Sequence, residues 1–315
     1  MPNAAAAVQL DRVTKTFGPQ VAVDDLSLAV PSGSVYGFIG PNGSGKTTTL
    51  RMIMRIIMPD RGGIRVLDDE RENVLDLVSY LPEERMLYKQ MKVFEVLRFF
   101  ARLKGVNPTR KQIDDWLDRL NLPGVAEKKV ETLSKGMTQK VQLVATLISE
   151  PKLVLLDEPF SGLDPVNAVV LRDTILDMRK RGTTVIFSTH DMAVAERMCD
   201  FIFMIYKGKK VLDGSMRSIH QTYGTDVIHV RIEPQANGNA SPLMENLPGV
   251  VKVTDLGNVQ ELRTTAGTDQ QALLAELMRR GRVTHFEVAH PSLHDIFVRI
   301  ASPDQVVPKG ETVLA

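Results

Sequence analysis

One glycine-rich stretch decides the fold of this chain: Gly40-Pro41-Asn42-Gly43-Ser44-Gly45-Lys46-Thr47-Thr48. It fits the phosphate-binding pattern in which a glycine, a short variable run, glycine, lysine and a hydroxyl residue follow one another. The residues before it, 35–39, predict a buried strand, and residues 47–58 contain no glycine or proline and predict a helix. A strand, a glycine loop and a helix N-terminus together hold a polyphosphate, because free backbone N–H groups and the helix dipole favour an anion.

Individual residues of this loop have predicted roles. Gly43 and Gly45 permit backbone torsions that a Cβ atom would forbid. Lys46 is expected to reach the β- and γ-phosphates, and the Thr47 hydroxyl is expected to bind Mg²⁺. The sequence therefore predicts that the whole stretch from Gly40 to Thr48 binds a nucleotide.

Composition is that of an ordinary globular protein. The chain has 315 residues, of which 43% are hydrophobic and 24% charged, and its net charge of +1 gives no reason to expect a nucleic acid partner. Its one cysteine, Cys199, lies among apolar residues and is expected in the core, so no internal disulfide is possible. No run of eighteen apolar residues occurs, so we expect no membrane-spanning helix, and the first residues do not fit a secretion signal.

The order of predicted elements indicates an α/β fold with a parallel sheet core. Two alternating strands, at 8–13 and 21–30, are expected to form an antiparallel flank before the glycine loop. Pro59 is expected to end the helix that follows the loop. A helical insert at about 85–150 interrupts the strand–helix alternation, and within it Thr109 and Gln112 fit a capping box. Further strands are predicted at 64–67, 77–81, 153–157, 183–188, 201–206 and 209–213, and further helices at 93–104, 138–149 and 166–181.

A boundary is expected near residues 215–224, because the pattern changes beyond it. The first domain would span 8–220, and residues 225–301 would form a small α+β domain. Its predicted order is strand, helix, two strands, helix, strand, which suggests a ferredoxin-like sandwich. This order includes a short helix from Ser241-Pro242 and a hairpin across Leu256-Gly257-Asn258. Residues 302–315 are expected to be a loose tail.

Two acidic residues follow the apolar run at 153–156. Parallel strands buried on both faces end at the edge where ligands bind, so Asp157 is expected to serve Mg²⁺ there, directly or through water. Glu158 stands one residue further on, where it could polarise a water in line with the γ-phosphate. The guanine-reading Asn-Lys-x-Asp sequence of phosphate-loop GTPases is absent.

The full set of motifs resembles an ATP-binding subunit of an ABC transporter. The resemblance covers roughly residues 8–220 and rests on residues 40–48, 133–137, 153–158, 161–164 and His190, in the family's order. It implies that Leu133-Ser134-Lys135-Gly136-Met137 is the signature motif, whose Ser134 and Gly136 contact ATP bound to a second subunit. It also implies that Asp164 communicates across the dimer and that His190 senses the γ-phosphate. Without these motifs, His190 would be taken as an ordinary core or surface histidine.

Some positions depart from the family pattern. Lys135 and Met137 replace the usual Gly and Gln of the signature. Glu83 stands where the family has a glutamine that links Mg²⁺ and water to the membrane partner; a carboxylate can accept from metal-bound water but cannot donate as an amide does. Phe17 stands where an aromatic residue stacks on adenine, although as a sequence feature alone it could equally be a packed core aromatic.

Two further segments resemble one branch of the family, the sodium-extrusion-type exporter ATPases with a C-terminal extension. They are 81–85, which reads Leu-Pro-Glu-Glu-Arg, and 291–297. The resemblance implies an ATP- and Mg²⁺-dependent ATPase at the cytoplasmic face of a membrane. Two such subunits, expected to be identical, would form a dimer and drive a separate permease. The expected direction of transport is export.

Some alternatives stay open at this point. Leu87, Tyr88, Met91 and Phe94 could line the groove that receives a permease helix, or could simply pack within the insert. A soluble ABC ATPase acting on ribosomes or DNA is a rival function, although such proteins usually carry two cassettes or a long coiled coil. A regulatory nucleotide binder with little turnover is another, which Glu158 argues against.

Overall fold

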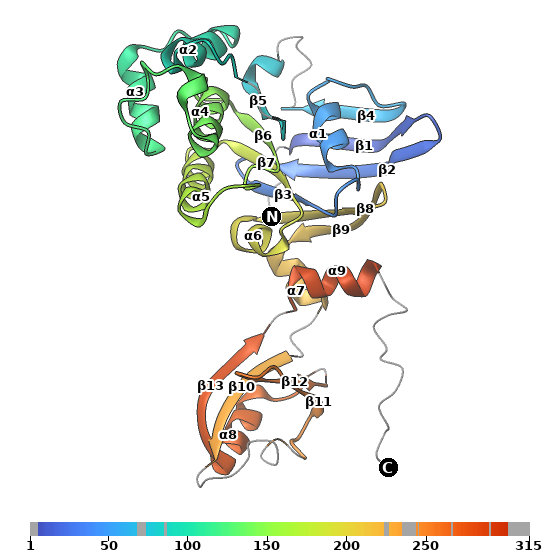
Figure 1. Ribbon diagram of the computed structural model, residues 1–315. Coiled ribbons are helices and arrows are strands. Elements are labelled where there is room, and N and C mark those ends of the chain that lie inside the picture. Colours follow the sequence, from blue (N-terminus) through green and yellow to red (C-terminus); the bar gives the residue numbers. More distant parts are fainter. Residues whose placement is uncertain are drawn as a thin grey trace. The chain divides into compact units, whose positions relative to one another are not determined.

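The computed structural model describes residues 6–67, 74–84, 87–223, 227–234, 244, 246–265, 267–289 and 291–301. These residues form two compact units, Met1–Ser215 and Met216–Ala315 (Figure 1). Among the described residues, no helix is both long enough and apolar enough to cross a membrane.

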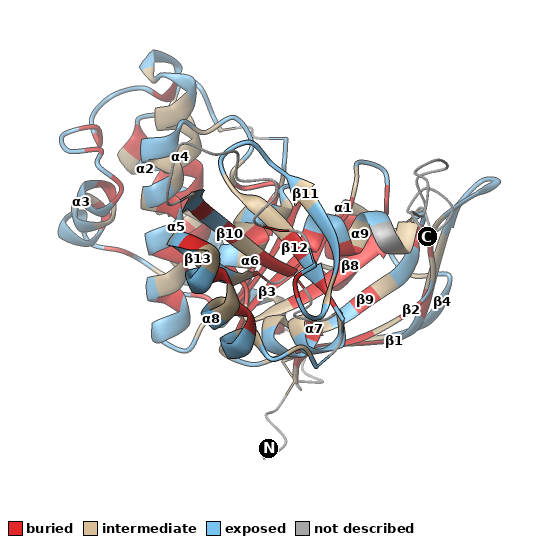
Figure 2. Cartoon of the chain, turned by 90° about the horizontal axis from the view of Figure 1, so that it is seen from below, coloured by how far each residue is buried: buried red, intermediate tan, exposed pale blue. Residues whose placement is uncertain are grey.

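A six-stranded sheet forms the centre of the first unit. Its strands lie in the order β5 (Val78–Leu81), β6 (Leu153–Asp157), β7 (Thr184–Thr189), β3 (Val35–Ile39), β8 (Phe201–Tyr206) and β9 (Lys209–Ser215). All pairs are parallel except the hairpin of β8 and β9. Every residue of β3, β6 and β7 is buried, which explains the apolar runs within them. In Figure 2 buried residues, in red, lie along β3 and β8 of this sheet. The predicted parallel core is therefore confirmed.

An antiparallel sheet flanks this core. It consists of β2 (Gln20–Pro31), β1 (Ala6–Phe17) and β4 (Arg61–Val66), in that order. Alternate residues of β1 and β2, such as Val8, Leu10 and Leu26, pack in one hydrophobic cluster with Phe38 of β3 and Leu50 of the following helix. The predicted antiparallel flank is thus confirmed, with strands longer at both ends than the sequence pattern suggested. Cys199 is buried, as expected.

Helix α1 (Lys46–Ile53) follows the glycine loop but is shorter than predicted. The prediction carried this helix to Met58, whereas the chain leaves it at Met54. Arg55 adopts a left-handed conformation with φ of 55°, and Ile56 N–H donates to Arg51 O at 2.9 Å. This is a Schellman end, usually made by glycine, so an arginine in that position gave no sequence signal.

The helical insert contains α2 (Val93–Leu103), α3 (Arg110–Arg119) and α4 (Lys135–Leu147), with short 3₁₀ turns at Val74–Leu77, before the insert, and Val130–Thr132, within it. In Figure 1 these three helices gather on the side of the unit away from the antiparallel sheet. The capping box of Thr109 and Gln112 is confirmed. Helix α4 starts at Lys135, not at the predicted Thr138, because the Ser134 hydroxyl caps it by accepting from Met137 N–H at 3.2 Å. Helices α5 (Pro165–Lys180) and α6 (Met192–Met198) complete this unit.

The second unit has an antiparallel sheet in the order β11 (Val250–Asp255), β12 (Gln260–Thr264), β10 (Val227–Pro234), β13 (Gly281–Ala289). Helices α7 (Met216–Tyr223), α8 (Gln270–Arg280) and α9 (Leu293–Ala301) belong to it. The hairpin across Gly257 is confirmed. The strand order is that of a ferredoxin-like sheet. Its core joins Ile228, Val230 and Leu262 to Leu273 and Leu277 of α8. The expected short helix from Ser241 and the tail after residue 301 lie outside the described residues.

Candidate active site

Three neighbouring strands bring the predicted site residues to one edge of the sheet. Strand β7 lies between β6 and β3, and all three run parallel. The glycine loop follows β3, Asp157 and Glu158 stand at the end of β6, and His190 follows β7. Residues far apart in sequence therefore meet at the carboxyl edge, where ligands bind in open α/β sheets.

The loop needs glycine at particular positions. A Cβ atom at Gly40 would overlap the carbonyl oxygen of Ile205, and one at Gly45 would lie 2.5 Å from the carbonyl oxygen of Ala22. Gly45 has φ of 112° and Gly43 has φ of 75°, in the region that glycine adopts most readily. This loop conformation therefore favours glycine at positions 40, 43 and 45.

Lys46 lies inside the loop and is only 5% exposed. Its Nζ donates to the carbonyl oxygens of Gly40 at 2.7 Å and Pro41 at 3.1 Å, and lies 3.6 Å from Glu158 Oε1. Burial lowers the pKa of Lys46, since the ammonium loses water, while the nearby charges of Glu158, Asp157 and Glu83 act in the opposite direction. A buried cation among carbonyls at a helix N-terminus is suited to grip an anion.

Asp157 is fully buried and accepts hydrogen bonds from hydroxyl groups on three sides. Its Oδ1 accepts from Thr47 at 3.1 Å and from Ser188 at 2.6 Å, and its Oδ2 accepts from Tyr80 at 3.3 Å. Burial, followed by the charge of Asp157, raises the pKa of Tyr80 to about 12, so this phenol stays protonated and donates at neutral pH. The carboxylate is thus held in one orientation beside the loop.

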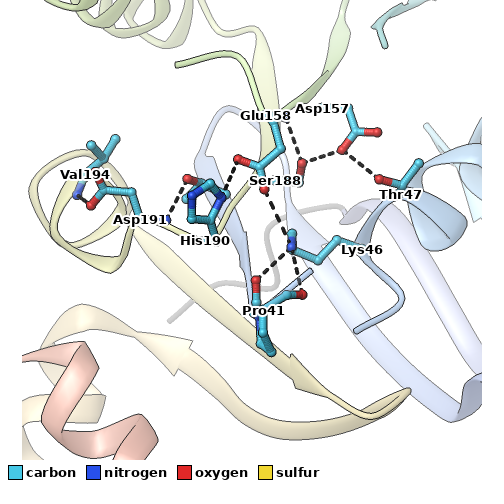
Figure 3. A network of polar contacts seen from close by, with 11 residues as sticks. Pro41, Lys46, Thr47, Asp157, Glu158, Ser188, His190, Asp191 and Val194 are labelled. Atoms are coloured by element: carbon cyan, nitrogen blue, oxygen red, sulfur yellow. Dashed lines mark hydrogen bonds and ion pairs between the residues drawn. The ribbon is translucent and has the colours of Figure 1, made fainter. Parts of the chain in front are cut away.

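Glu158 is 6% exposed and has φ of 46°, a left-handed conformation that is uncommon outside glycine. Its backbone N–H donates to Ser188 Oγ at 2.9 Å, and its Oε2 lies 3.1 Å from His190 Nδ1. Figure 3 shows His190, Glu158 and Lys46 in one row, with Ser188, Asp157 and Thr47 beside them. The row places a carboxylate between a lysine and an imidazole, whose side chain is 58% exposed.

The donors present fit a phosphate and Mg²⁺. The buried Ser44 hydroxyl in the loop has no hydrogen-bond partner among the residues that the structure describes, as expected of a group awaiting an anion. Asp157 and Thr47 supply the oxygen ligands that Mg²⁺ prefers. No group of three or more His, Cys, Asp or Glu side chains within the described ranges could hold a metal by itself, and Mg²⁺ commonly needs only one or two carboxylates with substrate phosphates.

Other predicted residues lie outside this hydrogen-bonded cluster. Phe17, at the end of β1, is 50% exposed with Lys15 Nζ 5.6 Å from its ring centre, so the alternative of a packed core aromatic is wrong. Ser134 and Gly136 lie at the N-terminus of α4. This helix contacts the motif at 161–164, because Gln139 Nε2 donates to Ser161 O at 3.2 Å. Glu83 follows β5 and is exposed, and its negative charge acts to raise the pKa of Lys46. Asp164 caps α5 by accepting from Asn167 N–H at 2.9 Å.

Sequence reasoning missed two residues of the cluster, Tyr80 and Ser188. Both stand within predicted strands, where a hydroxyl group carries little signal. Ser188 offers one clue, as a polar residue directly after the apolar run Val185-Ile186-Phe187 of β7.

Comparison with known proteins identifies the family. The ABC transporter family model matches residues 23–161. An uncharacterized ABC transporter ATP-binding protein of Bacillus subtilis is 36% identical over 92% of this chain and 96% of its own length. The chain is an ABC transporter ATP-binding subunit. Its family makes it a nucleotide-binding ATPase subunit.

Both units of this ABC subunit have relatives. A model described as the C-terminal domain of DrrA1-3-like ATP-binding proteins matches residues 214–301. A Nod factor export ATP-binding protein of Paraburkholderia xenovorans is 32% identical over 94% of this chain and 97% of its own. A daunorubicin resistance ATP-binding protein of Streptomyces coeruleorubidus is 30% identical over 98% and 99%. A solved ATP-binding subunit of an ABC transporter is 29% identical and superposes with a TM-score of 0.63 over 69% of this chain and 93% of that one.

Proposed function

We propose that this ABC subunit hydrolyses ATP to ADP and phosphate at the cluster around Lys46, and that it powers export through a separate membrane permease. The observation that carries the proposal is the buried contact of Lys46 Nζ with Glu158 Oε1 at 3.6 Å, because a phosphate-binding cation and a carboxylate base would have to lie this close together. The name of the Nod factor export relative supports export.

Each residue of the cluster has a chemical task in this proposal. Lys46 and the loop N–H groups would bind the β- and γ-phosphates, and the Ser44 hydroxyl, buried without a partner among the described residues, would add a donor. Glu158 would orient the attacking water and accept its proton, and His190 would steady the γ-phosphate from the other side of Glu158. Thr47 and Asp157 would hold Mg²⁺, which neutralises charge on the phosphates when bound. Glu83, exposed near Lys46, would accept from metal-bound water.

We infer that a second ATP-binding subunit, an identical chain, completes each site. Ser134 and Gly136 lie at a helix N-terminus and would present a hydroxyl and backbone N–H groups to ATP held by the partner. Phe17 would stack on adenine, which its 50% exposure allows. ATP would close the dimer and hydrolysis would open it.

A groove beside β5 supports a permease partner at the cytoplasmic face of a membrane. A cavity of about 330 Å³ lies between the end of β5, α2 and α4, with Leu81, Pro82, Leu87 and Phe100 in its lining. The exposed rings of Tyr88 and Phe99 meet edge-to-face beside it at 5.6 Å. An exposed apolar patch of this kind suits a partner helix.

Phe94, also expected at this groove, is not among the residues that line the cavity. It is half-buried, and the Arg110 guanidinium lies 5.1 Å from its ring centre. A Tyr88→Glu, Phe99→Glu double variant should retain ATP hydrolysis but lose the permease from detergent-solubilised membranes. Equal recovery of a multi-span protein with this variant and with the parent would remove the groove from the proposal.

A soluble ABC ATPase of ribosomes or DNA remains the rival function. The net charge of +1 and the transporter names of the relatives favour the permease. Ribosomal proteins in place of a multi-span membrane protein in the same purification would favour the rival.

The direct test of hydrolysis compares the full chain with Glu158→Gln. The amide keeps the shape but loses the base, so phosphate release should fall about 10²–10⁴-fold. Binding of a fluorescent ATP analogue should persist in the variant. Parental turnover in Glu158→Gln would remove Glu158 from the catalytic role.

We also propose that the two units are separate domains divided near residues 215–224. The nucleotide residues all lie in Met1–Ser215, and the second unit has its own hydrophobic core. A chain ending at residue 224 should remain soluble and bind ATP. We infer that the second domain tunes dimer contact or permease coupling. An insoluble product would refute the division.

A further inference from the structure

A single hydroxyl group joins the two acidic residues of the site. Ser188 Oγ donates to Asp157 Oδ1 at 2.6 Å and accepts from Glu158 N–H at 2.9 Å. Ser188 is completely buried. A hydroxyl group can donate one hydrogen bond and accept others through its lone pairs, so both bonds can form together. Charge-assisted bonds to a buried carboxylate are among the stronger hydrogen bonds in proteins.

The sheet order explains why this residue reaches both acids. Strand β7 is the middle strand between β6, which ends in the acids, and β3, which leads to the glycine loop. Ser188 pairs in register with Asp157, and the following residue, Thr189, pairs with Ile39 next to the loop. Ser188 therefore lies where the metal-binding acid, the base and the phosphate loop converge.

The conformation of Glu158 makes its bond to Ser188 important. A left-handed conformation is strained for a residue other than glycine, and Glu158, with φ of 46°, keeps it only where its surroundings hold it. The bond from Glu158 N–H to Ser188 is one such restraint on the buried backbone. It keeps the chain turned so that the Glu158 carboxylate lies between Lys46 and His190.

We propose that Ser188 is a positioning residue that fixes the orientations of Asp157 and Glu158 together, so that Mg²⁺ binding and water activation depend on one hydroxyl group. It would act through the two acids and would not itself touch ATP. This inference rests on the proposed ATPase function. Tyr80 provides an internal comparison, because its hydroxyl reaches Asp157 at 3.3 Å but forms no described bond with Glu158.

Two substitutions of equal volume isolate the hydroxyl group. Ser188→Thr keeps it, whereas Ser188→Val places a methyl group in its position. Residues that orient metal ligands typically contribute about 10–100-fold in metal affinity or activity. We expect Ser188→Val to lose turnover by about that factor, and Ser188→Thr to recover most of it. Ser188→Ala, which adds no bulk, should behave as Ser188→Val does.

A binding measurement without turnover complements the rates. Affinity for a fluorescent ATP analogue is measured in Mg²⁺ and in EDTA. Ser188→Val should bind as the parent does in EDTA, since the loop around Lys46 is intact, but should gain less affinity on adding Mg²⁺. In Tyr80→Phe, excess Mg²⁺ should reduce the deficit in turnover, because only Asp157 has lost a donor. In Ser188→Val, excess Mg²⁺ should not reduce the deficit in turnover, because the Glu158 N–H has lost its acceptor as well.

The outcomes separate this inference from the function beneath it. Parental turnover and Mg²⁺ dependence in Ser188→Ala and Ser188→Val, with Glu158→Gln inactive, would overturn the role of Ser188 alone. Loss in both Thr and Val but not in Ala would show that bulk matters and the hydroxyl does not, which also overturns it. A parent protein that releases no phosphate, or a fully active Glu158→Gln, would instead overturn the proposed function.

Discussion

Lys46 Nζ lies 3.6 Å from Glu158 Oε1, and both side chains are more than nine-tenths buried. They follow different strands, since Lys46 begins the helix after β3 and Glu158 comes directly after β6. Because water is largely excluded, the charge of each is felt strongly by the other and by any anion brought between them. In the function proposed above, this pair is where a terminal phosphate would meet the base.

Removing the Lys46 ammonium should weaken ATP binding more than it weakens the fold. A hydrogen bond to a charged group contributes about 2 kcal/mol, so Lys46→Met should lower ATP affinity roughly thirtyfold while keeping the side-chain volume. Lys111→Met, at an exposed lysine of α3, is the control and should bind as the parent does. Equal affinities in both variants, by isothermal titration, would contradict the assignment.

Alanine in place of three glycines should produce a graded series. Gly40→Ala would press a methyl group into the Ile205 carbonyl, so it should displace the loop and abolish measurable nucleotide binding. Gly43→Ala has open space but φ of 75°, and should cost roughly 1–2 kcal/mol of stability. Gly63→Ala, with no atom within 4 Å and no positive φ, should be nearly neutral. Thermal unfolding and nucleotide titration measure the three effects, and a different ranking of the three variants would contradict this prediction.

Substitutions of Phe17 should change the affinity for the base of the nucleotide but not for its phosphates. Loss of an aromatic stacking partner costs about 1 kcal/mol, so Phe17→Ala should lower ATP affinity roughly fivefold and Phe17→Tyr should not. Affinity for inorganic tripolyphosphate, which has no base, should be the same in all three proteins. A parallel loss of tripolyphosphate binding would indicate that Phe17 supports the loop instead.

Thr109 tests the local reasoning about helix α3. Its side chain and that of Gln112 form reciprocal bonds at the helix start, and loss of such a cap costs about 1 kcal/mol. Thr109→Ala should lower the free energy of unfolding of this region by that amount, and Thr109→Ser should retain most of it. The only tryptophan, Trp116, lies on the same helix and reports its unfolding in urea by fluorescence. Coincident curves for Thr109→Ala and the parent would show that the cap is dispensable.

The sequence predicted those features that local spacing encodes. Residues 40–48 and the Asp157–Glu158 pair were recognisable because glycine, lysine and strand-end acids must follow one another in a fixed order. The contacts of Asp157 were not recognisable, since Ser188 is 31 residues away in the chain and Tyr80 is 77 residues away. Both contacts depend on which strands become neighbours. The early end of α1 depends on the conformation of Arg55, which composition does not reveal.

The mass of Glu158→Gln in ATP and Mg²⁺ tests most directly the claim that two chains build each site. This variant should bind ATP without hydrolysing it, and Ser134 of each chain should close on the nucleotide of the other. Light scattering should therefore give the mass of one chain without nucleotide and twice that mass with ATP and Mg²⁺. Adding Ser134→Arg to the same variant should keep it at the mass of one chain. An ATP-saturated Glu158→Gln protein that remains a single chain would contradict the account.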